Sequence, residues 1–189
     1  MIDKLKSFLN FVRNLLLFHF RYPWIQYGKN VHVQWSTTFW APNRKVLLGN
    51  NVGIGSNCAI LSDLVVGNDV LIAPSVAFLS RRTHRYDIVG VSTFQSPRGD
   101  KGEIVIEDDV WIGYGAIIMS GVRIGRGAVI GAGVLIQNSV PAYTIVVQRP
   151  NLVLRRRFTP EEIEEHELHL QRKGVMSGTG KEKAFPGDS

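Results

Sequence analysis

His84 is the side chain best suited to chemistry, and it stands in a segment, residues 80–103, whose glycines, proline and charges are typical of an exposed loop. A histidine, with a reference pKa of about 6.5, is mostly neutral at pH 7 and can take a proton from a hydroxyl group. We therefore predict that His84 is a general base; the alternative is a histidine that is only solvated. Asp87 follows three residues later, and two interpretations stay open: it orients the imidazole, or it caps a turn.

Other reactive side chains give weaker signals. His166 and His169 are three residues apart in a segment rich in glutamate. A metal ion would need further ligands, so we expect a solvated helix face there and no metal site. Cys58 is the single cysteine, which excludes a disulfide framework and a multi-cysteine zinc site and fits a reducing compartment. We expect Cys58 itself to be a small apolar residue of the core.

A repeat of six residues runs through the chain on both sides of the loop. Neither an α-helix nor a single strand produces that period. Of the residues four positions after each leading residue, eleven of twelve are also apolar, and the exception, Arg82, lies where the pattern breaks. The twelve leading residues are all large and apolar: Leu48, Ile54, Ile60, Val66, Ile72, Phe78, Ile106, Ile112, Ile118, Ile124, Ile130 and Ile136.

This pattern predicts an all-β solenoid in which three hexads close one coil and coils stack about 4.8 Å apart as parallel strands. Phe78 and Ile106 are 28 residues apart, which is not a multiple of six, so residues 80–103 must leave the coil and return. The regular coils are expected at 48–65, 66–83, 106–123 and 124–141, after a less regular coil at about 28–47.

The remaining parts frame this body. Residues 1–27 are expected to form an amphipathic helical segment, with a helix that ends before Pro23 and has Lys4, Lys6, Arg13 and Asn14 as its polar residues. The β-helix domain spans 28–158. Residues 159–162, Thr-Pro-Glu-Glu, form a capping box that opens a helix over 159–173. Residues 174–189 are expected to be disordered.

The net charge of +6 lies mostly at the N-terminus: residues 1–30 contain five Lys or Arg against one Asp, whereas residues 104–153 sum to zero. A nucleic-acid binder would carry that charge across its body, so we expect no nucleic-acid partner. Two interpretations of the N-terminal helix stay open, a cap on the solenoid or an interfacial helix on an anionic membrane. We expect a cytoplasmic protein; contact with the inner membrane through residues 1–20 is the open alternative.

The sequence resembles the left-handed β-helix, hexapeptide-repeat acyltransferases, which include maltose and galactoside, xenobiotic and O-antigen sugar O-acetyltransferases. The matching residues are 84–87 (His-Arg-Tyr-Asp), 102–113 (Gly-Glu-Ile-Val-Ile-Glu-Asp-Asp-Val-Trp-Ile-Gly) and 130–133 (Ile-Gly-Ala-Gly). The resemblance covers about 28–158. It implies a left-handed parallel β-helix with an extruded loop, acetyl-CoA as co-substrate, no metal, and a homotrimer with its active sites between subunits.

The resemblance also implies five residues that contact CoA. Trp111 matches a tryptophan that lines the acyl-CoA groove, Tyr114 lies beside it, and Ala132 matches a small residue at the pantetheine arm. Gln137 stands where relatives commonly have Thr, with Asn where they have Lys, so one cation is missing. Arg155 and the two arginines after it are either its replacement at the 3′-phosphate or a solvated basic turn.

The leading prediction is therefore an acetyl-CoA-dependent O-acetyltransferase that acts on a sugar hydroxyl of a surface polysaccharide or its precursor. Transfer is direct, with His84 as the base. A xenobiotic or antibiotic acetyltransferase is the alternative enzyme, because residues 84–87 and 92–94 also resemble that subgroup. From another class, a non-catalytic β-helix scaffold is the alternative, but it gives no role to His84, Trp111 or the long loop.

Overall fold

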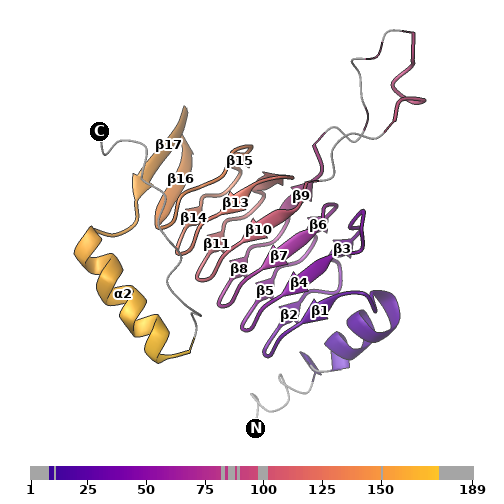
Figure 1. Cartoon of the computed structure of the whole chain (residues 1–189). Coiled ribbons are helices and arrows are strands. Elements are labelled where there is room, and N and C mark those ends of the chain that lie inside the picture. Colours follow the sequence, from indigo (N-terminus) through magenta and orange to yellow (C-terminus); the bar gives the residue numbers. More distant parts are fainter. Residues whose placement is uncertain are drawn as a thin grey trace.

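The computed structural model describes residues 9–10, 12–81, 84, 88, 90–97, 102–149 and 151–174. Strands three residues or shorter follow one another around three faces, so that each strand pairs in parallel with the strand one coil earlier and one coil later (Figure 1). We call the faces sheets I, II and III. Their described strands make five complete coils, and β16 begins a sixth. The predicted all-β solenoid with an N-terminal and a C-terminal helix is confirmed.

Each sheet takes one strand from every coil. Sheet I contains β1 (Gln26–Tyr27), β4 (Val46–Leu48), β7 (Leu64–Val66), β10 (Ile104–Ile106) and β13 (Arg123–Ile124). Sheet II contains β2 (His32–Val33), β5 (Gly53–Ile54), β8 (Leu71–Ile72), β11 (Trp111–Ile112), β14 (Val129–Ile130), β16 (Thr144–Arg149) and β17 (Asn151–Arg156). Sheet III contains β3 (Thr38–Phe39), β6 (Ala59–Ile60), β9 (Ala77–Leu79), β12 (Ile117–Met119) and β15 (Leu135–Ile136).

The core is the column of side chains enclosed by these three sheets. All twelve leading aliphatic and aromatic residues of the hexads are buried, and so are the eleven apolar residues four positions after them. Cys58 is one of these and is 2% exposed, as expected for a small core residue. The six-residue period is therefore the spacing between successive inward-facing positions on neighbouring faces.

The corner between sheets I and II turns through residues with left-handed backbone. In successive coils this position is held by Asn30, Asn51, Asp69, Asp109, Gly127 and Tyr143, with φ between 52° and 66°. Asn and Asp tolerate this conformation better than other non-glycine residues. The position before it forms a second ladder, in which Asn50 accepts from the amide of Lys29, and Asn68 and Asp108 repeat the bond one coil at a time.

The N-terminal helix closes the open end of the first coil. Its described part comprises residues 9–10 and 12–15 and the π-helical turn η1 (Leu16–Arg21). Leu17 and Phe18 are buried in the common core. Asn14 donates to the carbonyl oxygen of Val31 at 2.5 Å, so its side chain faces the solenoid. Asn14, one of the polar residues of the expected amphipathic helix, is therefore buried against the solenoid, where its amide satisfies a carbonyl group at the end of the coil.

The C-terminal part leaves the solenoid through an antiparallel hairpin. Strand β16 pairs in parallel with β14, and β17 returns along β16. Helix α2 (Pro160–Arg172) follows, and its predicted capping box is present: the hydroxyl of Thr159 accepts from the amide of Glu162, and the carboxylate of Glu162 accepts from the amide of Thr159. The hairpin does not follow the hexad period, and the sequence pattern does not predict it.

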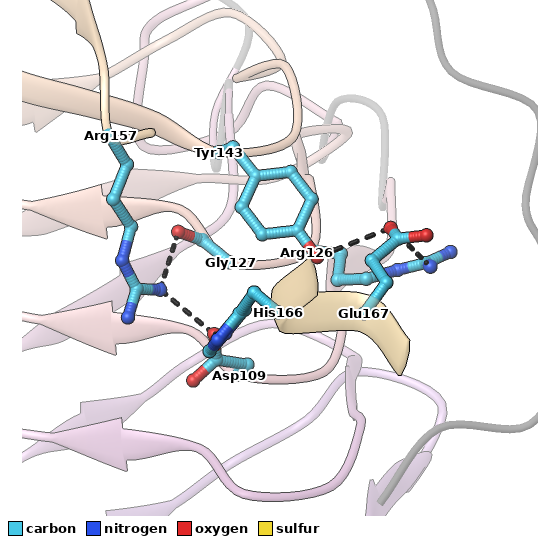
Figure 2. A network of polar contacts seen from close by, with 7 residues as sticks. All are labelled: Asp109, Arg126, Gly127, Tyr143, Arg157, His166 and Glu167. Atoms are coloured by element: carbon cyan, nitrogen blue, oxygen red, sulfur yellow. Dashed lines mark hydrogen bonds and ion pairs between the residues drawn. The ribbon is translucent and has the colours of Figure 1, made fainter. Parts of the chain in front are cut away.

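Helix α2 packs on the corner between sheets I and II through polar side chains (Figure 2). The imidazole of His166 lies 2.9 Å from a carboxylate oxygen of Asp109, which also accepts from Arg157 at 2.8 Å. The next residue of the helix, Glu167, accepts from Arg126 at 2.9 Å and from the hydroxyl of Tyr143 at 3.2 Å. The expected solvated face holds for His169, which is exposed, but is wrong for His166, because a carboxylate 57 residues earlier faces it.

Within the described parts of the chain, none of the helices combines the length and the apolar character needed to cross a bilayer. The same residues contain no group of three or more His, Cys, Asp or Glu side chains that could hold a metal ion.

Candidate functional site

The insertion that carries His84 leaves the solenoid at the corner between sheets III and I. Strand β9 ends before it and β10 begins after it, yet β7 pairs directly with β10 and β9 with β12. The third and fourth coils therefore stack without a gap, and the insertion projects from a corner whose hydrogen-bond ladder is intact (Figure 1).

Two buried serines hold the ends of this insertion, and we call Ser62 and Ser120 the serine clamp. Ser120, in the coil after the insertion, accepts from the amide of Arg81 at 2.8 Å. Ser62, in the coil before it, donates to the carbonyl oxygen of Gly102 at 3.0 Å. Their side chains are 3% and 1% exposed, so these bonds are shielded from water. Each end of the insertion is thus fixed by the coil on the opposite side.

Further contacts tighten the returning end. Gly102 has no room for a side chain, because a Cβ there would lie 2.9 Å from the amide nitrogen of Gly121. Glu103 forms an ion pair with Lys45, and its carbonyl oxygen accepts from Gly121 at 3.1 Å. The first and the last residues of the insertion are therefore held in place by the neighbouring coils.

His84 is exposed to solvent and lies three residues beyond the clamped Arg81. An exposed imidazole close to a fixed anchor can meet an acceptor molecule arriving from solvent. Its predicted partner Asp87 lies outside the described residues. Between residues 90 and 97 of the same insertion, Phe94 is 94% exposed.

Trp111 lies on the outer face of sheet II and is 55% exposed. Its strand neighbours in the same row are Leu71 and Val129, which gives this face an apolar strip made of Leu71, Trp111 and Val129. Leu71 is 62% exposed and lies over Gly53, where a Cβ would be 3.1 Å from a Leu71 methyl group. Sequence analysis missed Leu71, although its place directly before an inward-facing residue marks it as a large apolar side chain that points outward.

Tyr114 and Ala132 lie at the corner between sheets II and III, beside the strip. Both are exposed at the surface, and the amide of Gly133 donates to the carbonyl oxygen of Tyr114 at 2.8 Å. A Cβ on Gly113 would lie 2.7 Å from the amide of Ala132, so glycine permits the close stacking of these two turns. Three of the five predicted CoA residues, Trp111, Tyr114 and Ala132, are thus gathered on one edge.

The other two lie farther away. Arg155 is exposed on β17 and occupies the row of Trp111, with the strands β14 and β16 between them. Gln137 is exposed at the corner between sheets III and I, which is the corner of the insertion. Arg157 is neither a phosphate-binding residue nor part of a solvated turn. Its guanidinium donates to the carboxylate of Asp109 and to the carbonyl oxygen of Gly127, and these bonds hold the C-terminal segment on the solenoid.

The candidate residues of one chain are consequently divided between two sides. The insertion departs from the corner between sheets III and I, and that corner is opposite sheet II, which carries Trp111. The apolar core of the solenoid separates the clamped base of the insertion from the apolar strip.

Comparison with known proteins shows what this chain is similar to. Residues 103–138 match the model of the bacterial transferase hexapeptide, six repeats. This stretch of the solenoid is thus similar to bacterial transferase hexapeptide repeats. The resemblance to hexapeptide-repeat acyltransferases is thereby confirmed, and it agrees with the proteins of known sequence and structure to which the chain is similar.

Two curated relatives and one solved structure illustrate the similarity. A chloramphenicol acetyltransferase of Escherichia coli is 38% identical over 117 residues, covering 54% of this chain and 56% of the relative. A galactoside O-acetyltransferase of Lactococcus lactis subsp. lactis is 31% identical over 133 residues, covering 68% of this chain and 54% of the relative. The chain thus spans about half the length of these relatives.

The solved structure is a hexapeptide-repeat-containing acetyltransferase of Vibrio cholerae O1 biovar eltor, in complex with acetyl coenzyme A. It superposes with a TM-score of 0.61 at 24% sequence identity, covering 84% of this chain and 80% of that one. At this identity the similarity establishes the fold.

Proposed function

We propose that this chain is an acetyl-CoA-dependent O-acetyltransferase whose acceptor is a sugar hydroxyl of a surface polysaccharide or of its precursor. The observation that carries the proposal is an exposed histidine, His84, on an insertion whose two ends are fixed to a transferase hexapeptide solenoid. The names of the relatives support acetyl transfer, since the similar enzymes of Escherichia coli and Lactococcus lactis are both acetyltransferases.

The chemistry requires little of the protein, because a thioester is already activated. The acceptor hydroxyl oxygen attacks the thioester carbonyl carbon while the neutral imidazole of His84 takes the hydroxyl proton. Collapse of the adduct releases the thiol of CoA, which receives a proton, and leaves the acetyl ester on the acceptor. No covalent enzyme intermediate is needed. Trp111, Tyr114 and Ala132 would hold the acyl-CoA, and Arg155 offers a cation for its phosphates.

Each of the two acceptor classes, a sugar and an antibiotic, is supported by one of these relatives. The galactoside O-acetyltransferase covers the larger share of this chain and favours a sugar. The chloramphenicol acetyltransferase is more identical over a shorter stretch, which keeps an antibiotic acceptor as the second candidate. Both acceptors present a hydroxyl group, so the proposed base serves either.

We also propose that the active form is a homotrimer in which each site takes its base and its acyl-CoA face from different subunits. The division of His84 and Trp111 between opposite sides of one solenoid supports this arrangement. Two groups must lie within hydrogen-bond or contact distance of the same substrate to act together, and a neighbouring copy can bring its strip beside the insertion.

The test is a free-thiol assay with acetyl-CoA and a panel of sugars, glycolipids and chloramphenicol. We expect release of CoA with at least one acceptor, and a decrease in kcat of roughly a hundredfold or more in His84→Ala, the usual contribution of a general base. His169→Ala, which removes an exposed histidine of α2, is the matched control and should retain activity. Turnover in His84→Ala equal to that of the parent would refute the assignment of the base. Absence of both turnover and CoA binding would favour a scaffold.

A further inference from the structure

The N-terminal third of the chain has a one-sided charge. Residues 4–62 contain seven Lys or Arg residues and no Asp or Glu, since Asp3 is followed by Asp63 as the next acidic residue. Five of the seven cations lie in the described part of the N-terminal helix and in the first two coils, so one end of the solenoid carries a concentrated positive charge. A concentrated excess of positive charge attracts anionic partners and anionic surfaces.

The helix at this end exposes a second apolar face. Leu17 and Phe18 pack into the core, whereas Leu9, Leu16 and Phe20 are 58%, 42% and 71% exposed. Their spacing of seven and four residues places these three on one side of a helix. The capping role of the helix therefore uses one face and leaves a second apolar face exposed to solvent.

Aromatic side chains surround the first coil at the same level. Tyr27 lies on sheet I, Trp35 in the turn between sheets II and III, and Trp40 directly after the strand of sheet III. They are 46%, 51% and 49% exposed. Arg21, at the end of η1, donates to the carbonyl oxygen of Trp35, which ties the helix to this level. We call Tyr27, Trp35 and Trp40 the aromatic girdle.

Exposed cations accompany the girdle. Arg21, Lys29 and Arg44 are all exposed and belong to the helix end or to the first coil and its connection to the second. Lys45 forms an ion pair with Glu103, so it adds less to the positive charge of this end. Aromatic residues at half exposure, apolar side chains beyond them and cations at the same level are the arrangement that membrane–water interfaces favour.

We propose that the N-terminal end of the solenoid docks on an anionic phospholipid surface. The outer face of the helix enters the interface, the aromatic girdle lies at headgroup level, and Arg21, Lys29 and Arg44 contact phosphate groups. The solenoid axis then stands roughly along the membrane normal. A second copy of this end is a poor occupant, because it would bring an equal positive charge against the first. A nucleic acid would leave the leucines of the helix without a role.

The experiment is flotation of the full chain with phosphatidylcholine vesicles, with and without phosphatidylglycerol. We expect the protein to float with the anionic vesicles, to float much less with the neutral ones, and to be released by salt. Iodide quenching of tryptophan fluorescence is a second measurement, because Trp35 and Trp40 should become shielded on binding. Sedimentation without vesicles reports whether the same surface joins two copies.

Matched variants distinguish the contribution of the apolar side chains to vesicle binding from that of the charged side chains. Leu16→Asp with Phe20→Asp should abolish flotation, whereas Leu168→Asp, at an exposed leucine of α2, should not change it. Arg21→Glu with Lys29→Glu should lower the vesicle partition coefficient at least about tenfold, given roughly fivefold per basic residue near an anionic surface. Arg172→Glu is the control for charge. Circular dichroism verifies that each variant is folded.

Several outcomes would overturn the proposal. It fails if the parent chain does not float with anionic vesicles, or if the helix variants float as well as the parent. Tight binding to duplex DNA without vesicle binding would assign the positive end to nucleic acid instead. A change of oligomeric state in Leu16→Asp with Phe20→Asp, without vesicle binding by the parent, would assign it to a subunit interface. None of these results depends on acetyl transfer.

Discussion

At the scale of single residues, the corner between sheets I and II shows how one conformation is reused for different purposes. Asn51 and Asp69 use the left-handed turn to bond neighbouring coils. Asp109 uses it to face Arg157 and His166. Tyr143 is the exception, since a bulky side chain adopts this conformation only at a cost that surrounding contacts must offset. Its ring is buried and its hydroxyl reaches Glu167.

Gly127 leaves the space that Tyr143 occupies, so Gly127→Ala should destabilise the chain. A methyl group would overlap the Tyr143 ring, and the backbone is left-handed at φ 66°. We expect a loss of about 2–4 kcal/mol in the free energy of unfolding, measured in urea. Gly133→Ala is the control, because Gly133 has φ 68° with nothing within 4 Å of a Cβ. An equal loss in both variants would show that only backbone strain matters.

Because Tyr143 is buried, we expect the folded chain to lose stability at high pH. Burial, with Glu167 beside the hydroxyl, raises the pKa of Tyr143 above its usual value of about 10. The folded state then favours the neutral phenol, so this contribution is complete below pH 10 and is lost as the pH rises above it. Urea unfolding between pH 8 and about 11.5 should show a decline in stability that is smaller in Tyr143→Phe. Equal slopes in the two proteins would contradict the assignment to Tyr143.

At the scale of elements, the period of six predicts the coils because each hexad must place one large apolar residue inward. It predicts the insertion because the phase is lost between Phe78 and Ile106. The hairpin β16–β17 escapes prediction, since its six-residue strands do not turn a corner after each inward residue. The docking of α2 escapes as well, because His166 and Asp109 come together only when the last coils have formed.

The serine clamp should control the opening of the insertion at its base. Ser120→Ala removes the acceptor of the Arg81 amide, so hydrogen exchange of that amide should become faster by roughly fivefold or more, as for the loss of about 1 kcal/mol of hydrogen bonding. Ser120→Thr keeps a hydroxyl group and should restore much of the protection. Ser80→Ala is the matched control, since Ser80 donates to Leu61 in the preceding coil. Unchanged exchange in Ser120→Ala would mean that the clamp is not what holds this end.

At the scale of the whole molecule, both halves of the candidate site can be predicted from the sequence, but the distance between them cannot. His84, Trp111, Tyr114 and Ala132 follow from loop chemistry and from the family resemblance. Their separation follows from which corner each hexad occupies, and that depends on the phase of all coils together. Leu71 belongs to the same face; its residue type alone is that of a core residue, and only its place directly before the inward-facing Ile72 shows that it points outward.

The proposed division of each site between two subunits can be tested by mixing inactive chains. We expect His84→Ala and Trp111→Ala to be nearly inactive alone, and mixed oligomers formed by unfolding and refolding them together to regain part of the parent activity. Some sites would then combine an intact insertion with an intact acyl-CoA face. The control is each variant refolded alone. Mixed oligomers that stay inactive, with subunit exchange verified by a size tag, would show that each site belongs to one chain.

The unbroken ladder beside the insertion has an evolutionary consequence. Because β7 pairs with β10 and β9 pairs with β12, strand pairing sets the register of the coils independently of the sequence between the clamped ends at Arg81 and Gly102. Mutations that lengthen, shorten or replace that stretch are thus decoupled from folding of the coils. Under the proposed function, acceptor preference can diversify there at little risk to the scaffold, whereas the same number of residues added inside a coil would shift every inward side chain beyond it.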